Sequence, residues 1–315
     1  MMTHTPTTTQ TTTQTTQPPR STPPPRAPRF ARARNLPLAV SVRVLLTVLA
    51  MTGASFGAAI GTAAALGPSA DSPAGSMTVF AVVCAAGTLL AWGLRRFFEG
   101  DRSGYLAAGW DGGRALGSFG LGLLAATLAV AAARAVSLLS GRASIQSVPP
   151  QPLSEWLIGI VLMIGVSVLL QGVPEEMLWR GYFQTTVAER LRPWTAAVIG
   201  SVGFGSMHLV SIGSGGTWVS KLVYVLMAMG LGLACAGLRV LTGSLWAAAG
   251  FHGGMHIVNR TLSIWIPEGQ DQASVAVLGA AMGIVFVACW VVDGVRRGDR
   301  AVTRTAGRTV SGWGG

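Results

Sequence analysis

The sequence predicts an all-α protein, a polytopic membrane bundle of about eight transmembrane helices, and three observations support this fold class. Half of the 315 residues are hydrophobic and only 11% are charged, whereas a soluble domain carries roughly a quarter charged residues. The mean hydropathy is positive. The apolar residues also gather in long runs, each near the roughly 20 residues that a helix needs to cross a hydrocarbon core.

The first 36 residues differ from the rest of the chain. They are mostly Thr, Gln, Pro and Arg, so they have little apolar surface to bury and predict a disordered cytosolic tail. A secretory leader is not expected, because this start is polar and apolar runs continue to residue 293. The three cysteines, Cys84, Cys235 and Cys289, are scattered singly in apolar runs and predict small core residues rather than a disulfide or metal framework.

Eight apolar runs follow the tail. They lie near residues 41–66, 76–94, 115–138, 156–188, 195–213, 218–238, 243–260 and 273–292. The seventh is the weakest because it contains two histidines, and six or seven spans are alternatives if a weak run is re-entrant. The expected organisation is a tail (1–36), N-terminal transmembrane helices (37–150), a core (151–262), a last transmembrane helix (263–295) and a basic cytosolic tail (296–315).

The basic residues predict the orientation of the bundle. With the N-terminus in the cytosol, most arginines fall on the cytoplasmic side, which is the bias found in membrane proteins. The outer side keeps only four basic residues, and one lies inside the first helix: Arg134, Arg142, Lys221 and Arg260 outside, and Arg43 within the helix. We therefore expect a multi-pass protein of the cell membrane with both termini cytoplasmic. The net charge of +11 then reflects topology in a lipid bilayer, not a nucleic-acid partner.

Two adjacent glutamates, Glu175 and Glu176, directly follow the apolar run 156–174. Ionised groups at membrane depth cost roughly 3 to more than 10 kcal/mol and usually mark a function. On a helix, Glu176 and Arg180 have the i, i+4 spacing that lets a carboxylate meet a guanidinium. This pairing would leave Glu175 free for chemistry, and Pro174 suits a kink or a fresh helical start. The alternative is that both glutamates mark an interfacial helix end.

A histidine, His208, lies in the next apolar run. Taking Arg192 as the turn between the two helices, Glu176 and His208 are equally far from it along the chain. In an antiparallel hairpin such residues lie side by side, roughly 24 Å from the turn at 1.5 Å per residue. If residues 185–192 project into the cytosol, the pair lies in the cytoplasmic half of the membrane.

Three polar residues share one face of a later helix. His252, His256 and Asn259 are spaced i, i+4 and i+7. Gly253 and Gly254 would let another backbone or a substrate approach this helix closely. The i, i+4 histidines are also a spacing of helical zinc ligands, although Gly253 stands where the hydrolytic zinc motif has a glutamate.

The order and spacing of these motifs resemble the CAAX-protease and bacteriocin-processing family, which includes the type II CAAX prenyl endopeptidases and their bacterial relatives. The resemblance covers about residues 155–260. It rests on Glu175-Glu176-x-x-x-Arg180, Arg180-Gly181 followed by Gln184, Phe204-x-x-x-His208, Ser244-Leu245-Trp246 and the motif that begins at His252.

This resemblance implies an intramembrane endopeptidase that acts on a peptide or protein substrate at the membrane and needs no cofactor. By position, Glu175 is similar to the family's general base, His208 to its partner and His252 to a donor to the tetrahedral oxyanion. The family usually has Asn four residues after that histidine, where this chain has His256. An imidazole N–H can also donate to an oxyanion, and Asn259 is a second stand-in.

Two other classes are kept as alternatives. A zinc-dependent peptidase would use histidines and a glutamate as ligands: His208, His252, His256 and Glu175. A non-catalytic scaffold, immunity protein or proton-coupled carrier would also retain buried Glu and His, although no inverted repeat favours a carrier. A prenylated C-terminus, a leader peptide and a membrane-protein segment all fit as substrates, and the sequence does not determine the oligomeric state.

Overall fold

The computed structural model describes residues 34–310, apart from residues 104–105, 107, 110, 211–215 and 268–271; side chains are not described at 210 and 299–310. Within this part of the chain the regular structure is entirely helical. The described residues therefore confirm the predicted all-α class. Nearly all of the predicted tail at 1–36 lies outside the described residues, as do residues 311–315.

The helical segments follow one another with few breaks. In order they are α1 (Leu36–Thr52), η2 (Gly53–Ala58), α2 (Ala59–Leu66), η3 (Gly67–Asp71), α3 (Pro73–Gly93), η4 (Leu94–Phe98), α4 (Gly112–Leu139), α5 (Leu153–Ile164), η5 (Gly165–Gly172), α6 (Val173–Glu176), η6 (Met177–Gln184), α7 (Thr185–Val187), α8 (Pro193–Met207), η7 (His208–Val210), α9 (Trp218–Thr242), α10 (Leu245–Ser263) and α11 (Gln272–Val310).

Six of the described helical rods are long and apolar enough to cross a membrane. They are Leu36–Asp71, Pro73–Phe98, Gly112–Leu139, Leu153–Val187, Trp218–Thr242 and Gln272–Gly298. The chain is therefore a multi-pass membrane protein. Where they are described, the eight predicted apolar runs coincide with helices, but α8 has only 15 residues, about 22 Å at 1.5 Å per residue. In α10 the histidines lower the hydropathy, so eight crossings remain a prediction.

The C-terminal end of the bundle differs in detail from the expectation. The last helix was expected to end at 295 and to be followed by a basic tail, but α11 continues without interruption to Val310. The arginines that follow residue 295 do not interrupt the helix, because arginine is a good helix former.

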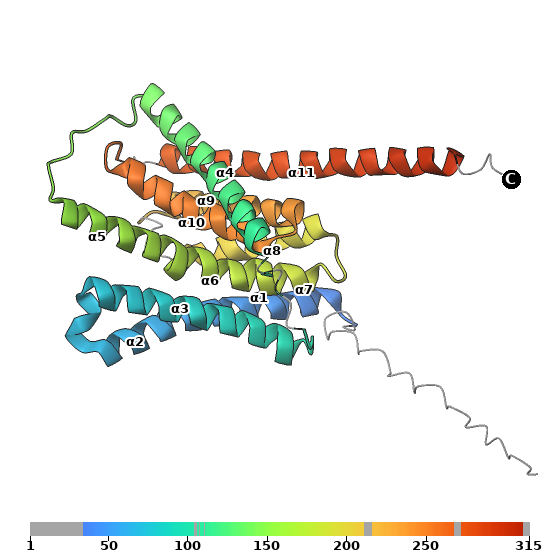
Figure 1. Ribbon diagram of the computed structural model, residues 1–315, viewed down its shortest axis with the longest axis horizontal. Helices are drawn as coiled ribbons and strands as arrows, with labels where there is room; N and C mark the ends of the chain where they lie inside the picture. Colours follow the sequence, from blue (N-terminus) through green and yellow to red (C-terminus); the bar gives the residue numbers. More distant parts are fainter. Residues whose placement is uncertain are drawn as a thin grey trace, which may run out of the picture.

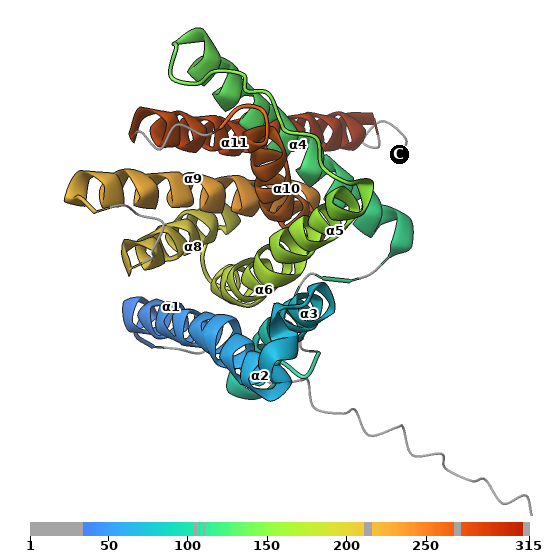
Figure 2. The ribbon, with the colours of Figure 1, turned by 90° about the vertical axis from the view of Figure 1, so that its left-hand side faces the viewer.

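The helices stack in layers (Figure 1). Figure 2 shows α1–α3 on one side of the molecule, α5, α6, α8, α9 and α10 in the middle, and α4 with α11 on the other side. The middle layer holds much of the core, including the fully buried Trp179, Tyr182, Phe183, Phe204 and Phe251. The motifs predicted to carry chemistry all fall in this layer.

Glycines bring α4 and α10 into backbone contact. A Cβ added at Gly122 would lie 2.1 Å from the Ala247 carbonyl oxygen, and one at Gly250 would lie 2.1 Å from that of Phe119. Only glycine permits such a close approach. Helix α10, which carries two of the predicted histidines, is thus fixed against α4.

Candidate active site

The two glutamates lie on a short α-helical segment between two π-helical ones. Segment α6 (Val173–Glu176) is preceded by η5 and followed by η6. π-Helical turns are rare and are frequently found at functional sites. Pro174 lacks a backbone donor, and Gly87 of α3 packs against it, since a Cβ there would lie 2.6 Å from that of Pro174. The predicted break before the glutamates is therefore a change of helical type.

Glu176 is fully buried and is held by two partners. Its Oε1 accepts a hydrogen bond of 2.9 Å from Arg180 Nη1 and one of 2.8 Å from His252 Nδ1. Arg180 also donates to the Gly232 carbonyl oxygen at 2.6 Å, and its guanidinium lies 5.1 Å from the centroid of the Phe204 ring. The predicted Glu176–Arg180 ion pair is confirmed.

Glu175 is less enclosed than its neighbour. Its side chain is 13% exposed, and its Oε2 lies 3.8 Å from His252 Nε2. A carboxylate oxygen without a proton can only accept, so the bond to Glu176 requires a hydrogen on His252 Nδ1. The imidazole thus spans the two glutamates, with Nδ1 on Glu176 and Nε2 beside Glu175.

His208 lies at the end of α8 and contacts aromatic rings. Its Nδ1 donates to the Phe204 carbonyl oxygen at 3.0 Å, and its ring centroid lies 5.0 Å from that of Phe204 and 5.7 Å from that of Tyr224. Phe204 in turn lies edge-on to His252, with centroids 5.9 Å apart. His208 therefore joins the site through Phe204.

The prediction that Glu176 and His208 lie side by side, because they are equally far from Arg192 in the sequence, is only approximate. Phe204 stacks over Arg180 and contacts Trp179 at a centroid distance of 6.0 Å, so the antiparallel packing of α8 on η6 is as expected. A π-helical turn contains more residues than an α-helical turn and advances less per residue. An equal number of residues from the turn therefore does not correspond to an equal distance along the two helices.

The third motif is divided between two environments. The rings of His252 and His256 lie 5.3 Å apart and are inclined by 33°, as their shared face predicts. Asn259 Oδ1 instead accepts a hydrogen bond of 2.7 Å from Arg134 Nη2 of α4, and Arg134 also donates to Ser263 Oγ at 2.9 Å. The structure thus places the Asn259 side chain in a polar cluster with Arg134. This arginine is buried, and the topology prediction assigned it to the outer side of the bundle.

A comparison with known protein families matches the part of the chain that contains these residues. Residues 157–258 match the family model described as type II CAAX prenyl endopeptidase Rce1-like. The chain contains an Rce1-like domain. The match begins in α5, ends in α10 and includes every predicted site residue except Asn259. No curated protein matches the chain.

Glycines set the distance between η5 and α10 at the candidate site. A Cβ added at Gly172 would lie 3.0 Å from the backbone nitrogen of Gly253 and 3.1 Å from its Cα. Gly253 directly follows His252, so this crossing brings the imidazole to the glutamates. The prediction that Gly253 admits a close backbone is confirmed.

Replacing Gly172 by Ala is expected to lower the free energy of unfolding by about 1–3 kcal/mol, because it overpacks a backbone crossing, and to reduce activity with it. Gly159→Ala is the matched control, since it lies on the same helical rod with nothing within 4 Å of an added Cβ. Unfolding of both variants in detergent checks the prediction. Equal stability of the two would show that the crossing tolerates a methyl group.

One described cluster of potential metal ligands lies in the candidate active site. Ligand atoms of Glu176, Cys235 and His252 fall within 4.8 Å of one another, a set different from the predicted zinc alternative. Glu176 Oε1, however, already accepts from the cationic guanidinium of Arg180 and from His252 Nδ1. Its other oxygen, Oε2, is buried and has no hydrogen-bond partner among the described residues, so a cation bound there would share the carboxylate with Arg180 and His252.

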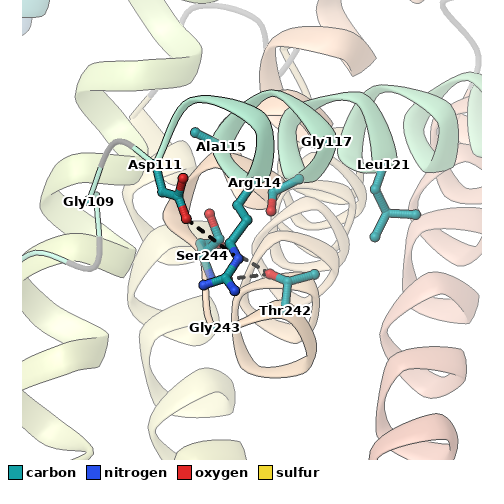
Figure 3. A pocket seen from close by; sticks show the side chains of 10 residues that line it. Gly109, Asp111, Arg114, Ala115, Gly117, Leu121, Thr242, Gly243 and Ser244 are labelled. Carbon is teal, nitrogen blue, oxygen red and sulfur yellow. Dashed lines mark hydrogen bonds and ion pairs between the residues drawn. The ribbon is translucent and has the colours of Figure 1, made fainter.

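A surface pocket of about 510 Å³ lies apart from the glutamates (Figure 3). It is formed by the start of α4 and the turn between α9 and α10, where Asp111 and Arg114 form an ion pair of 3.5 Å. Ser244 lines it and caps α10 by accepting from the backbone N–H of Trp246 at 3.2 Å. None of the predicted site residues lines this pocket.

Proposed function

We propose that the Rce1-like domain is an intramembrane endopeptidase that hydrolyses a peptide bond with water activated by Glu175. The family match supports a protease. The observation that carries the proposal is the chain of contacts from Arg180 through Glu176 to His252, which ends beside Glu175. A base oriented by a second group, which a third group fixes, is the usual arrangement for activating a nucleophile.

In this mechanism Glu175 takes a proton from the attacking water, and the water oxygen forms a bond to the peptide carbonyl carbon. Glu176 holds the imidazole of His252 through Nδ1, and Arg180 holds Glu176 in place. Collapse of the tetrahedral intermediate breaks the C–N bond, and the proton held by Glu175 passes to the leaving amine. Glu175 is thereby regenerated as a carboxylate.

The predicted oxyanion role of His252 requires its doubly protonated form. The Nδ1 hydrogen is committed to Glu176, so donation to substrate must come from an Nε2 hydrogen. The two carboxylates, 2.8 Å and 3.8 Å from the ring nitrogens, supply the negative charge that balances an imidazolium. His256 lies beside this ring, with centroids 5.3 Å apart, and His208 remains the proposed partner of the base.

We expect cleavage to be independent of metal. Dialysis of the purified protein against a chelator should leave the initial rate unchanged, and metal analysis should find far less than one zinc per chain. The reason is that the guanidinium of Arg180 already balances the negative charge of Glu176. Loss of activity on chelation with recovery on adding zinc would instead support the zinc-peptidase alternative.

The proposed substrate is a protein anchored in the cytoplasmic leaflet of the cell membrane, such as a prenylated C-terminus. The name of the matched family supports this class of substrate. The glutamates also lie nearer to Val187 than to Leu153 in their helical rod, and Val187 is the end of the rod that the predicted topology places toward the cytosol. Cleavage of a prenylated peptide in proteoliposomes, with the same peptide lacking the prenyl group as control, tests the proposal. Equal cleavage of both peptides would exclude prenyl recognition.

A further inference from the structure

A second buried ion pair joins Arg43 to Glu99. It lies outside the segment that matches the family, and it contacts η6. Arg43 of α1 donates from Nε and Nη2 to the two carboxylate oxygens of Glu99, both at 2.9 Å. Glu99 follows η4 and is 0% exposed. Its Oε1 also accepts a hydrogen bond of 3.1 Å from the hydroxyl of Tyr182.

Tyr182 connects this pair to the proposed active site. It lies in η6, two residues after Arg180, and its ring is fully buried. The π-helical form of η6 determines which way each side chain projects, and it is less favourable than an α-helix without tertiary support. A hydrogen bond from Tyr182 to a fixed carboxylate supplies such support at the centre of the segment.

Other contacts between the N-terminal helices and the catalytic segment surround this bond. Trp179 Nε1 donates to Met51 Sδ at 3.3 Å, and Arg95 Nη1 donates to Thr186 Oγ1 at 3.0 Å. Arg95 also pairs with Glu189 at 2.7 Å and with Asp101. Among these contacts, the hydrogen bond between Glu99 and Tyr182 is the one that joins a buried charged side chain to η6.

We infer that Glu99 is a positioning residue of the peptidase, which acts through Tyr182 to hold the π-helical segment that places Arg180 against Glu176. The first helices of the bundle are then part of the enzyme and not merely a membrane anchor. The inference rests on the proposed function for its effect on catalysis. The structural part of the inference, that Glu99 orders η6, does not depend on any activity.

Two conservative variants test this role. Tyr182→Phe removes one hydroxyl and keeps the ring, and Glu99→Gln keeps the shape but removes the charge. Each is expected to lower kcat by about 10- to 100-fold, the loss associated with a small misplacement of catalytic groups, with KM within about twofold of wild type. Amide hydrogen exchange in peptides that cover residues 176–184 should become faster in both variants.

Thr47→Val is the matched control, because Thr47 is fully buried in α1 and donates to its own helix at the Arg43 carbonyl oxygen. It should leave kcat and exchange at 176–184 unchanged. If Glu99→Gln does not fold, Tyr182→Phe decides the question. Wild-type kcat and wild-type exchange in Tyr182→Phe would overturn the inference. If Glu175→Gln retains cleavage, the proposed function fails, and the exchange measurement alone decides whether Glu99 orders η6.

Discussion

Replacement of Glu175 by Gln is expected to lower the cleavage rate by about 10³-fold, within the range that a general base contributes. Glutamine has nearly the same shape as glutamate, but its amide cannot take a proton from water. The loss should appear in kcat rather than KM, because the base acts in the transition state and not in substrate binding.

The same variant should fold and insert as the wild type does. Glu175 approaches His252 only at 3.8 Å, so no short buried hydrogen bond is lost. Glu155→Gln is the matched control, since Glu155 lies on the same helical rod and is exposed at its other end. Initial rates and thermal unfolding of the three proteins, measured in one detergent, separate catalysis from folding. Wild-type cleavage by Glu175→Gln would rule out the glutamate mechanism.

Replacement of Arg180 by Met is expected to destabilise the protein by about 3–5 kcal/mol, because it leaves the buried carboxylate of Glu176 without its cation. It also leaves the Gly232 carbonyl oxygen without the donor that lies 2.6 Å away. His252 would then share a site with an uncompensated charge, so cleavage should be lost together with stability.

A second substitution distinguishes charge from packing in this result. Arg180→Met combined with Glu176→Leu removes both charges, and we expect it to recover part of the stability but none of the activity. Arg114→Met is the control, since Arg114 is 89% exposed and its ion pair with Asp111 lies at the surface; its effect should stay within about 0.5 kcal/mol. Unchanged stability of Arg180→Met would contradict the account of Glu176 as a buried, paired carboxylate.

Local sequence patterns predicted the helices and the intrahelical contacts well. The i, i+4 spacing of Glu176 and Arg180 predicted their ion pair, because the two residues lie one turn apart on a continuous helical rod, across the junction of α6 and η6. The length and hydropathy of the apolar runs predicted about eight transmembrane helices, and six of the described rods are long and apolar enough to cross a membrane. The glycines of α10 likewise predicted close packing, although they did not identify the partner helix.

Contacts between helices were harder to predict, since they depend on helical type and register. The π-helical form of η6 leaves no clear pattern in the sequence, and the structure places Phe204 against Arg180 and Trp179 of this segment. The position of Asn259 was missed because Arg134, on a helix 125 residues away in the chain, hydrogen-bonds its side chain. An arginine within an apolar run was the available signal, and the same signal at Arg43 marks the pair with Glu99.

The most direct test of the peptidase assignment is cleavage of a prenylated, membrane-anchored peptide in chelator-treated proteoliposomes, with wild type and Glu175→Gln assayed side by side by mass spectrometry. The account predicts that the wild type releases a fragment cut at one peptide bond and that Glu175→Gln releases none above background. Release of the same fragment at equal rates by both proteins would contradict it.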